Sequence, residues 1–270
     1  MNSEYFAIVF VTFLTDFGTA DYFASACKGA LLTVCPSARA FAFSHEIPPQ
    51  DIAAAAFTLL AGYDVWPAAT IHVAVVDPGV GSARRPLLVE AGGYYFAGPD
   101  NGLFSYIYER HTDDLRVRHV TNQDYFRQPV NPSFHGRDVF APVAGALACG
   151  VAPDEFGPDI TDFARLAPLK PTRHADGSLA SRVIHIDRFG NCITGFSRQD
   201  VDEEQLAKEF RLTTNGHEII RLQRFFAETN DATPFAIWGS AGFLEISVRN
   251  ASAAQLLNLQ RGAQVILCGV

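Results

Sequence analysis

The first two-thirds of the chain alternates strand-like and helix-like segments, and this alternation constrains the fold more than any other feature. Apolar runs with the length of buried strands occupy 7–14, 40–44 and 71–76, and helical patterns occupy 22–34 and 52–63. Strands joined through helices in this way form a mostly parallel sheet whose faces are covered by the helices. The sequence therefore predicts an α/β domain, which we assign to residues 1–170.

The pattern changes in the last third of the chain. A stretch rich in proline, glycine and polar residues, at about 167–178, is typical of a linker. Beyond it, short strand-like runs follow one another with little helical pattern between them. We therefore expect a second, smaller and β-rich domain over residues 178–270, shaped like a β-barrel.

The composition narrows the classes of partner and cofactor. A net charge of −8 over 270 residues, without a basic stripe, argues against binding to nucleic acid. No apolar run is long enough to span a membrane. The eight histidines lack the spacing of a zinc site, so we expect no metal. The five cysteines form no C-x-x-C pair and lie mostly in apolar surroundings, so we expect reduced thiols and a cytoplasmic protein.

One turn places an acid and a base where α/β proteins bind their ligands. The apolar run that ends at Val76 breaks at once into an Asp-Pro-Gly-Val-Gly turn that begins at Asp77, and Arg84 follows seven residues after Asp77. Ligands in such folds bind at the carboxyl ends of the strands. The alternative is a purely structural turn, in which Asp77 caps backbone amides and the arginine faces solvent.

Two further segments of the first domain carry candidate site residues. Asp16 directly follows the first apolar run, where a carboxylate can accept hydrogen bonds from a ribose diol, whereas Asp21 is expected to cap the next helix. His135 lies just before a helical segment, a position that suits a general base or a structural histidine equally. Arg137 and Asp138 are expected to form a local ion pair beside it.

The second domain contributes two loops of interest. Asp187 and Asn191 lie where a strand-like run ends, and they could bind a ligand or simply form a turn, since both residue types favour turns. Ser240 lies in a loop of small residues whose backbone amides and hydroxyl could hold a carboxylate.

Taken together, these segments closely resemble the S-adenosyl-L-methionine hydroxide adenosyltransferases, also called adenosine-forming S-adenosylmethionine (SAM) hydrolases, which are relatives of the fluorinases and chlorinases. The motifs that carry the resemblance run in the family order across nearly the whole chain: Thr-Asp-Phe-Gly (15–18), Cys-Lys-Gly (27–29), Val-Asp-Pro-Gly-Val-Gly (76–81), Gly-Pro-Asp-Asn-Gly (98–102), Phe-His-Gly-Arg-Asp (134–138), Ile-Asp-Arg-Phe-Gly-Asn (186–191) and Gly-Phe-Leu-Glu-Ile (242–246). Each motif alone is short, but the combination is very specific.

The resemblance implies a reaction and an assembly. The reaction is hydrolysis of SAM to adenosine and L-methionine, by in-line attack of water or hydroxide on the ribose C5′. SAM is then the substrate, and no cofactor is needed. The assembly is a homotrimer in which each site lies between the N-terminal domain of one subunit and the C-terminal domain of its neighbour.

The resemblance also assigns the catalytic set and favours the branch of the family that uses hydroxide. Asp77, Arg84 and His135 match that set, with either His135 or Asp77 as proton acceptor and Arg84 holding the water. The halogenases carry a tyrosine in place of Asp77 and a tryptophan in place of Gln50. The fluorinase also has an extra loop, which this chain lacks because Arg85 runs directly into the next strand-like run.

The resemblance further assigns the residues that bind the substrate, whose roles are as follows: Asp16 on the ribose hydroxyls, Asp187 on the methionine ammonium, Ser240 on the methionine carboxylate, Asn191 on the adenine edge, and Phe226 (or Phe225) as a stacking ring. The residue after Ser240 is an arginine in the fluorinase and Ala241 here. Two alternatives are a halide-dependent adenosyl transferase and a protein that binds an adenosyl ligand without turning it over.

Overall fold

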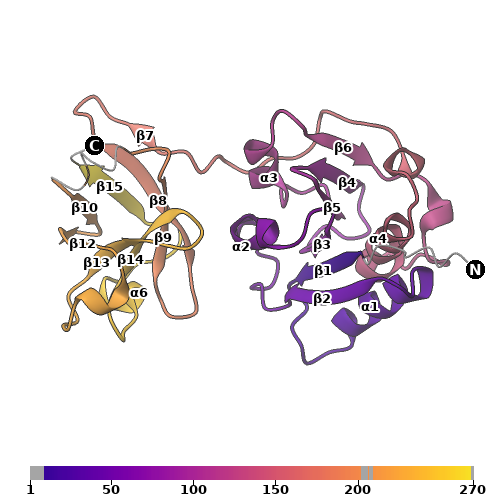
Figure 1. Cartoon of the computed structure of the whole chain (residues 1–270), viewed down its shortest axis with the longest axis horizontal. Helices are drawn as coiled ribbons and strands as arrows, with labels where there is room; N and C mark the ends of the chain where they lie inside the picture. Colours follow the sequence, from indigo (N-terminus) through magenta and orange to yellow (C-terminus); the bar gives the residue numbers. More distant parts are fainter. Residues whose placement is uncertain (1–8, 202–205, 207–208, 269–270) are drawn as a thin grey trace, which may run out of the picture. The chain divides into compact units, whose positions relative to one another are not determined.

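A computed structural model describes residues 9–201, 206 and 209–268. The chain divides into two compact units, Met1–Ala167 and Pro168–Val270, which are described separately (Figure 1). Within the described ranges, no helix has the length and apolarity that crossing a bilayer requires.

The first unit is built on a six-stranded sheet. Its strands lie in the order β2 (Arg39–Ser44), β1 (Phe10–Thr15), β3 (Ile71–Val75), β5 (Tyr94–Pro99), β4 (Pro86–Ala91) and β6 (Arg116–His119). The first four are parallel to one another, and β4 is antiparallel to both of its neighbours. The prediction of a mostly parallel sheet is therefore confirmed.

Helices cover both faces of this sheet, as predicted. Val11 and Phe13 of β1 belong to the core that α1 and α4 close, whereas Phe96 of β5 contacts Tyr63, which follows α2. The bounds of the helical elements in this unit are α1 (Phe23–Val34), α2 (Ile52–Gly62), η1 (Tyr63–Val65), α3 (Ser105–Arg110), η2 (Gln123–Tyr125), the π-helix η3 (Gly136–Phe140), α4 (Ala141–Ala148) and η4 (Pro153–Phe156).

The two helix starts near the site differ from each other in how they are capped. At α2, the Asp51 side chain caps the helix by accepting a hydrogen bond from the Ala54 N–H at 2.9 Å. At α1, the N-cap is Tyr22, and no side chain caps the helix, so the prediction that Asp21 does so is wrong. Asp21 lies one residue too early, because a capping side chain must stand at the N-cap itself to reach the amides of the first turn.

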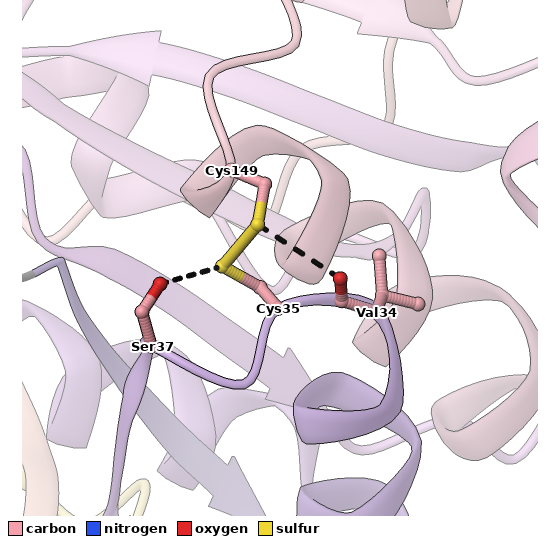
Figure 2. The surroundings of a disulfide bond; sticks show 4 residues. All are labelled: Val34, Cys35, Ser37 and Cys149. Atoms are coloured by element: carbon pink, nitrogen blue, oxygen red, sulfur yellow. Dashed lines mark hydrogen bonds between the residues drawn. A yellow bond between two sulfur atoms is a disulfide. The ribbon is translucent and has the colours of Figure 1, made fainter. Parts of the chain in front are cut away.

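A disulfide joins the ends of α1 and α4. Cys35 follows the last residue of α1, Cys149 follows the last residue of α4, and their Cα atoms are 5.7 Å apart across 114 residues of sequence (Figure 2). Gly145 lets the helices approach, since a Cβ there would lie 3.0 Å from the Leu31 carbonyl oxygen. The expectation of reduced cysteines is wrong for this pair, because only helix packing brings residues so distant in sequence together.

The other cysteines are free. Cys27 and Cys192 are buried, and Cys268 is half-buried. Burial raises the pKa of both the Cys27 and the Cys192 thiol to about 12, so neither is a reactive thiolate at neutral pH.

The second unit is a β-sheet that curls on itself as a half-barrel, which confirms the prediction of a small β-barrel-like part (Figure 1). Neighbouring strands are antiparallel except for β12 and β13. The strand order is β11 (His217–Ile219), β10 (Arg211–Thr214), β15 (Gln264–Cys268), β8 (Leu179–Ile186), β9 (Cys192–Ser197), β14 (Phe243–Ser247), β13 (Phe235–Trp238) and β12 (Leu222–Gln223), with β7 (Thr172–Arg173) paired to β8.

Among its described residues, the second unit also contains the short helices η5 (Phe226–Glu228) and α6 (Ala253–Leu256). Its core contains Leu179, Phe196 and Leu244. Strand β7 lies inside the stretch that the sequence pattern assigns to a linker, and its pairing with β8 makes that stretch part of the second sheet.

Candidate active site

A cavity of about 320 Å³ opens where β1 and β3 end. The two strands are parallel neighbours that pair Thr15 with Val75, so the residues that follow them emerge at the same edge of the sheet. Asp16 and Asp77 therefore both line the cavity, together with His135 from the start of the π-helix. These candidates are separated by up to 119 residues in the sequence, and the parallel topology brings them together.

Asp77, Arg84 and His135 form one hydrogen-bonded group. The Arg84 Nε donates to Asp77 Oδ1 at 3.0 Å, and its Nη2 forms an ion pair with Asp77 Oδ2. The same Nη2 donates to His135 Nδ1 at 2.8 Å. The Arg84 and Asp77 side chains are only 9% and 5% exposed, so the alternative of a solvent-facing arginine does not hold.

The turn between Asp77 and Arg84 sets the direction of the arginine. Gly81 has a φ of +78°, and a Cβ there would lie 2.4 Å from the Pro132 carbonyl oxygen, so only glycine fits. Ser82 Oγ then donates to the Gly79 carbonyl at 2.7 Å and closes the turn. The neighbouring Arg85 pairs instead with Asp100 and Asp162, at 2.6 and 2.8 Å.

The hydrogen bond to Arg84 defines the tautomer of His135. A guanidinium N–H can only donate, so Nδ1 of the imidazole is the acceptor and the neutral ring carries its hydrogen on Nε2. Burial, followed by the positive charge of Arg84, lowers the pKa of His135 below its usual value. His135 is therefore neutral at pH 7, with Nε2–H as its donor.

The second terminal nitrogen of Arg84 differs from the first in its surroundings. Nη1 is buried, and no acceptor for it exists among residues 9–201, 206 and 209–268. The guanidinium lies over the Phe140 ring, with Cζ 5.3 Å from the ring centroid. A buried donor without an acceptor is unfavourable by about 1–3 kcal/mol, so this nitrogen suits an oxygen of a ligand.

The helix start beside His135 is braced by Asp138, which is fully buried. Its carboxylate accepts from Arg137 Nε at 2.6 Å and from the Asn131 N–H at 2.9 Å. The predicted ion pair between Arg137 and Asp138 is confirmed, and it holds the turn that carries His135.

Asp16 is held by the backbone of the chain before α2. Its Oδ2 accepts from the Gln50 N–H at 2.8 Å, and Gln50 has a φ of +65°. The position of Asp16 at a strand end could be recognised in the sequence. The hydrogen bond from Gln50 could not, because Gln50 lies in a loop 34 residues away.

In the second unit, Asp187 and Asn191 form a single hydrogen-bonded turn. Asp187 Oδ1 accepts from the N–H groups of Phe189 and Asn191 at 2.9 and 2.8 Å, and Oδ2 accepts from Asn191 Nδ2 at 2.9 Å. Because Nδ2 donates to Asp187, the amide oxygen of Asn191 is the atom available to another partner.

Asn191 and Phe226 line the same cavity, of about 570 Å³, on the second unit. Phe189 lies at its edge and is 78% exposed. Phe225, the alternative stacking ring, does not line this cavity and lies beside the Arg224 guanidinium instead. Ser240 is exposed in the turn between β13 and β14 and lines neither this cavity nor the one near Asp77.

Glu245 on β14 is a half-buried carboxylate for which the sequence predicted no role. Its Oε1 lies so close to Gly239 that a Cβ on that glycine would be 1.7 Å away. Burial, followed by the negative charge of Asp187, raises the pKa of Glu245 to about 7. In the part of the chain that the structure describes, no cation pairs with it. An acidic residue inside the apolar strand Phe-Leu-Glu-Ile-Ser was the available signal.

The two halves of the chain match the two domains of a single family. Residues 11–157 match the SAM hydroxide adenosyltransferase N-terminal domain, and residues 181–266 match the C-terminal domain. An (R)-S-adenosyl-L-methionine hydrolase from Thermus thermophilus is 36% identical, and the match covers 95% of this chain and 98% of that protein. A fluorinase from an Actinoplanes species is more distant, at 24% identity over 94% of this chain and 96% of its own.

A solved structure agrees with this relationship. An uncharacterized conserved protein from Thermotoga maritima has a TM-score of 0.87 and 27% identity, covering 96% of this chain and 99% of that one. Both domain matches, the identity to a hydrolase along nearly the whole chain and the shared fold lead to one conclusion. This chain belongs to the SAM hydroxide adenosyltransferase family.

Proposed function

We propose that this protein hydrolyses SAM to adenosine and L-methionine. The observation that carries the proposal is the hydrogen-bonded group of Asp77, Arg84 and His135, of which Asp77 and His135 line the cavity at the strand ends. A water molecule in that cavity would lie beside a carboxylate that can take its proton, with the positive charge of Arg84 next to it. The relatives named as SAM hydrolases support the same reaction.

The hydrogen-bond directions favour Asp77 as the proton acceptor. His135 already accepts a hydrogen bond at Nδ1, and its other nitrogen carries the hydrogen, so the neutral ring has no free lone pair. Asp77 is a carboxylate, and each of its oxygens keeps lone-pair capacity beyond the bond from Arg84. Arg84 stabilises the resulting hydroxide electrostatically. His135 presents its Nε2–H as a hydrogen-bond donor.

The bond changes follow from this arrangement. The hydroxide oxygen attacks the ribose C5′ in line with the carbon–sulfur bond, and the electron pair of that bond returns to sulfur. The sulfonium becomes the neutral thioether of methionine, and the proton of the water rests on Asp77. Aligning the two reactants supplies much of the rate enhancement. A positioned base supplies about 10²–10⁴-fold.

We propose the following substrate contacts: Asp16 with the ribose hydroxyls, Asn191 with the adenine edge, Phe226 with the adenine face, Asp187 and Glu245 with the methionine ammonium, and Ser240 with the methionine carboxylate. The cavities beside Asp77 and beside Asn191 support the first three. No ion pair holds either carboxylate among the residues that the structure describes, and this supports the ammonium contact.

The first experiment is incubation of the purified protein with SAM in ¹⁸O-water, with mass spectrometry of the products. Adenosine that carries ¹⁸O on its 5′ oxygen, formed together with methionine, is the expected result. Methylthioadenosine as the product would contradict the hydrolase proposal. A nucleoside halogenated at C5′ when halide is present would favour the transferase. Binding without product would favour an adenosyl-ligand binding protein.

We also propose a homotrimer whose sites combine the first unit of one subunit with the second unit of its neighbour. Exposed aromatic rings support this: Tyr22 is 64% exposed beside Phe23 and Phe134 of one cavity, and Phe189 is 78% exposed at the other. Mixing unfolded Arg84→Met and Asp187→Ala/Asn191→Ala variants and refolding them together should restore activity that neither shows alone. Activity that stays absent in the mixed trimer would contradict shared sites.

We propose a cytoplasmic location as well. The buried, free thiols of Cys27 and Cys192 support it, although cytosolic disulfides such as Cys35–Cys149 are rare in most organisms. Trapping the thiols in intact cells with an alkylating reagent, followed by mass spectrometry, shows whether this pair is oxidised where the protein works.

Asn191 should make the enzyme selective for a 6-amino purine. Its free amide oxygen can accept a hydrogen bond from an adenine amine but opposes the 6-oxo group of hypoxanthine. We expect kcat/KM for S-inosylmethionine to be about 10²-fold below that for SAM. In Asn191→Ala the ratio should approach one, and an unchanged ratio in that variant would contradict the assignment.

Glu245 should make substrate binding depend on pH. With a pKa of about 7 in the free protein, its carboxyl group is mostly protonated at pH 6 and half-ionised at pH 7. Only the ionised form attracts an ammonium group, so the KM for SAM should fall about fivefold from pH 6 to pH 7. The Glu245→Gln variant should lose this dependence. If the slope persists in that variant, another group is responsible.

A further inference from the structure

His45 lies against the loop that carries Asp16. It follows directly after β2, whose last residue, Ser44, is paired with Leu14 of β1. The residue is 6% exposed, and its Nδ1 lies 2.9 Å from Thr15 Oγ1. The His45 carbonyl accepts a hydrogen bond from the Gly18 N–H at 2.7 Å. His45 therefore contacts the chain on both sides of Asp16, once through its ring and once through its backbone.

The hydrogen bonds around His45 connect its ring to the chain that follows Asp16. Thr15 Oγ1 accepts from the Phe17 N–H at 3.3 Å and is hydrogen-bonded to His45 Nδ1 at 2.9 Å. Burial, followed by the charge of Lys28, lowers the pKa of His45 and keeps the ring neutral. The series Phe17 N–H, Thr15 hydroxyl and His45 ring spans the loop that presents Asp16.

The same segment holds the Asp16 carboxylate from the other side. The Gln50 N–H donates to Asp16 Oδ2 at 2.8 Å, and the Ile47 N–H donates to the Thr15 carbonyl at 3.4 Å. Residues 45–50 are thus hydrogen-bonded to residues 15–18 at several points. Among the described residues, no donor binds Asp16 Oδ1. One carboxylate oxygen is fixed to the protein, and the other remains for a ligand.

We propose that His45 is a positioning residue for substrate binding, which holds the Asp16 carboxylate, through Thr15, in the orientation that receives the two ribose hydroxyls. The proposal rests on the proposed role of Asp16 in binding an adenosyl compound. A diol needs both hydroxyls aligned with one carboxylate, so a small rotation of the loop at Thr15 weakens two hydrogen bonds at once.

The molecule contains a matched control for this pair. On the same strand, Thr12 Oγ1 lies 2.7 Å from His72 Nδ1, and both side chains are buried. Nε2 of His72, like Nε2 of His45, finds no partner in the described part of the chain. The His72 ring is packed among aromatic side chains such as Tyr63 and Phe96, and not against the Asp16 loop. The two pairs are similar in chemistry and burial, and they differ in whether they reach the site.

The test compares binding of adenosine and 2′,3′-dideoxyadenosine to full-length variants by calorimetry. For His45→Leu we expect adenosine to bind about tenfold more weakly and dideoxyadenosine to bind as in the wild type. His45→Asn should restore adenosine binding, because its amide group can form the hydrogen bond to the Thr15 hydroxyl in place of Nδ1. His72→Leu should bind both nucleosides as the wild type does. In SAM turnover, His45→Leu should raise KM about tenfold and change kcat by less than about twofold.

A double-mutant cycle with Asp16 completes the test. If His45 acts through Asp16, adenosine should bind to Asp16→Ala/His45→Leu no more weakly than to Asp16→Ala alone. The proposal would be overturned if the losses of adenosine affinity caused by the two substitutions were additive. It would also be overturned if His45→Leu weakened the binding of both nucleosides equally, or if His45→Leu and His72→Leu weakened adenosine binding equally. A wild type that does not discriminate between the nucleosides would overturn it too. If the wild type binds adenosine more tightly than dideoxyadenosine and yet forms no adenosine from SAM, the hydrolase proposal is refuted. The role of His45 would still be supported by its effect on adenosine binding.

Discussion

Replacing Arg84 with methionine is expected to lower kcat for SAM hydrolysis by about 10³-fold. Arg84 is hydrogen-bonded to both other members of the proposed catalytic set, and its charge is proposed to stabilise the attacking oxygen. Losing one preorganised donor to a developing or bound oxyanion typically costs 10²–10³ in kcat. Here the proton acceptor also loses the charge that orients it. Adenosine release, followed by chromatography under saturating SAM, measures the effect.

Two companion variants separate chemistry from folding. Arg84→Lys keeps the charge, but a lysine cannot reproduce the planar fork that contacts Asp77 twice and His135 once, so most of the loss should remain. Asp77→Asn/Arg84→Met removes both buried charges and should be little slower than Arg84→Met, because the residues act as a unit. Adenosine affinity and thermal unfolding serve as controls for intact structure. A folded Arg84→Met variant within tenfold of the wild-type kcat would contradict the proposed mechanism.

Removing the Cys35–Cys149 disulfide is expected to lower the free energy of unfolding by roughly 4 to 5 kcal/mol. The bond closes a loop with a sequence separation of 114 residues, and the stabilisation from restricting the unfolded chain grows slowly with loop length. The Cys35→Ala/Cys149→Ala variant and the wild type in reducing agent should therefore show the same shift of the urea midpoint. Circular dichroism during urea unfolding measures it.

Cys268 provides the control for this experiment. It is free and half-buried, so Cys268→Ser should unfold at the same urea concentration as the wild type, with or without reducing agent. Activity of the reduced protein at 25 °C should be unchanged, because the disulfide lies at the ends of α1 and α4 away from Phe23 and His135. A urea midpoint of the wild type that does not respond to reductant would show that the disulfide contributes no stability.

Much of the architecture could be predicted because it depends on local patterns. The period of the apolar residues predicted α1, α2 and the parallel strands, and Asp51 caps α2 where the sequence places a helix start. The Asp77 and Arg84 pair was also predictable, because the two residues lie seven positions apart in one turn, where Gly81 permits the positive φ. His135 was ambiguous from its neighbours alone, and the family resemblance was needed to place it with them.

The incorrect predictions share a physical cause. The prediction that Asp21 caps α1 was wrong by a single residue, because capping requires an exact position at the helix end that the sequence pattern does not resolve. The prediction that all the cysteines are reduced missed the disulfide, because the two cysteines are brought together by the packing of α1 and α4 across 114 residues of chain. Glu245 had only one weak signal, a charge within an apolar strand, and its neighbour Asp187 comes from the turn that follows β8.

The amino-acid sequence was sufficient to predict the order and type of the elements, the turn that joins Asp77 to Arg84 and the family to which the chain belongs. These depend on residues close in sequence or on motifs in a fixed order. Three features came from the fold alone: Nη1 of Arg84 is buried without an acceptor among the described residues, His135 accepts at Nδ1, and His45 is hydrogen-bonded to the chain on both sides of Asp16. Burial and hydrogen-bond direction depend on atoms that the fold brings together from distant strands, and no local pattern of residues encodes them.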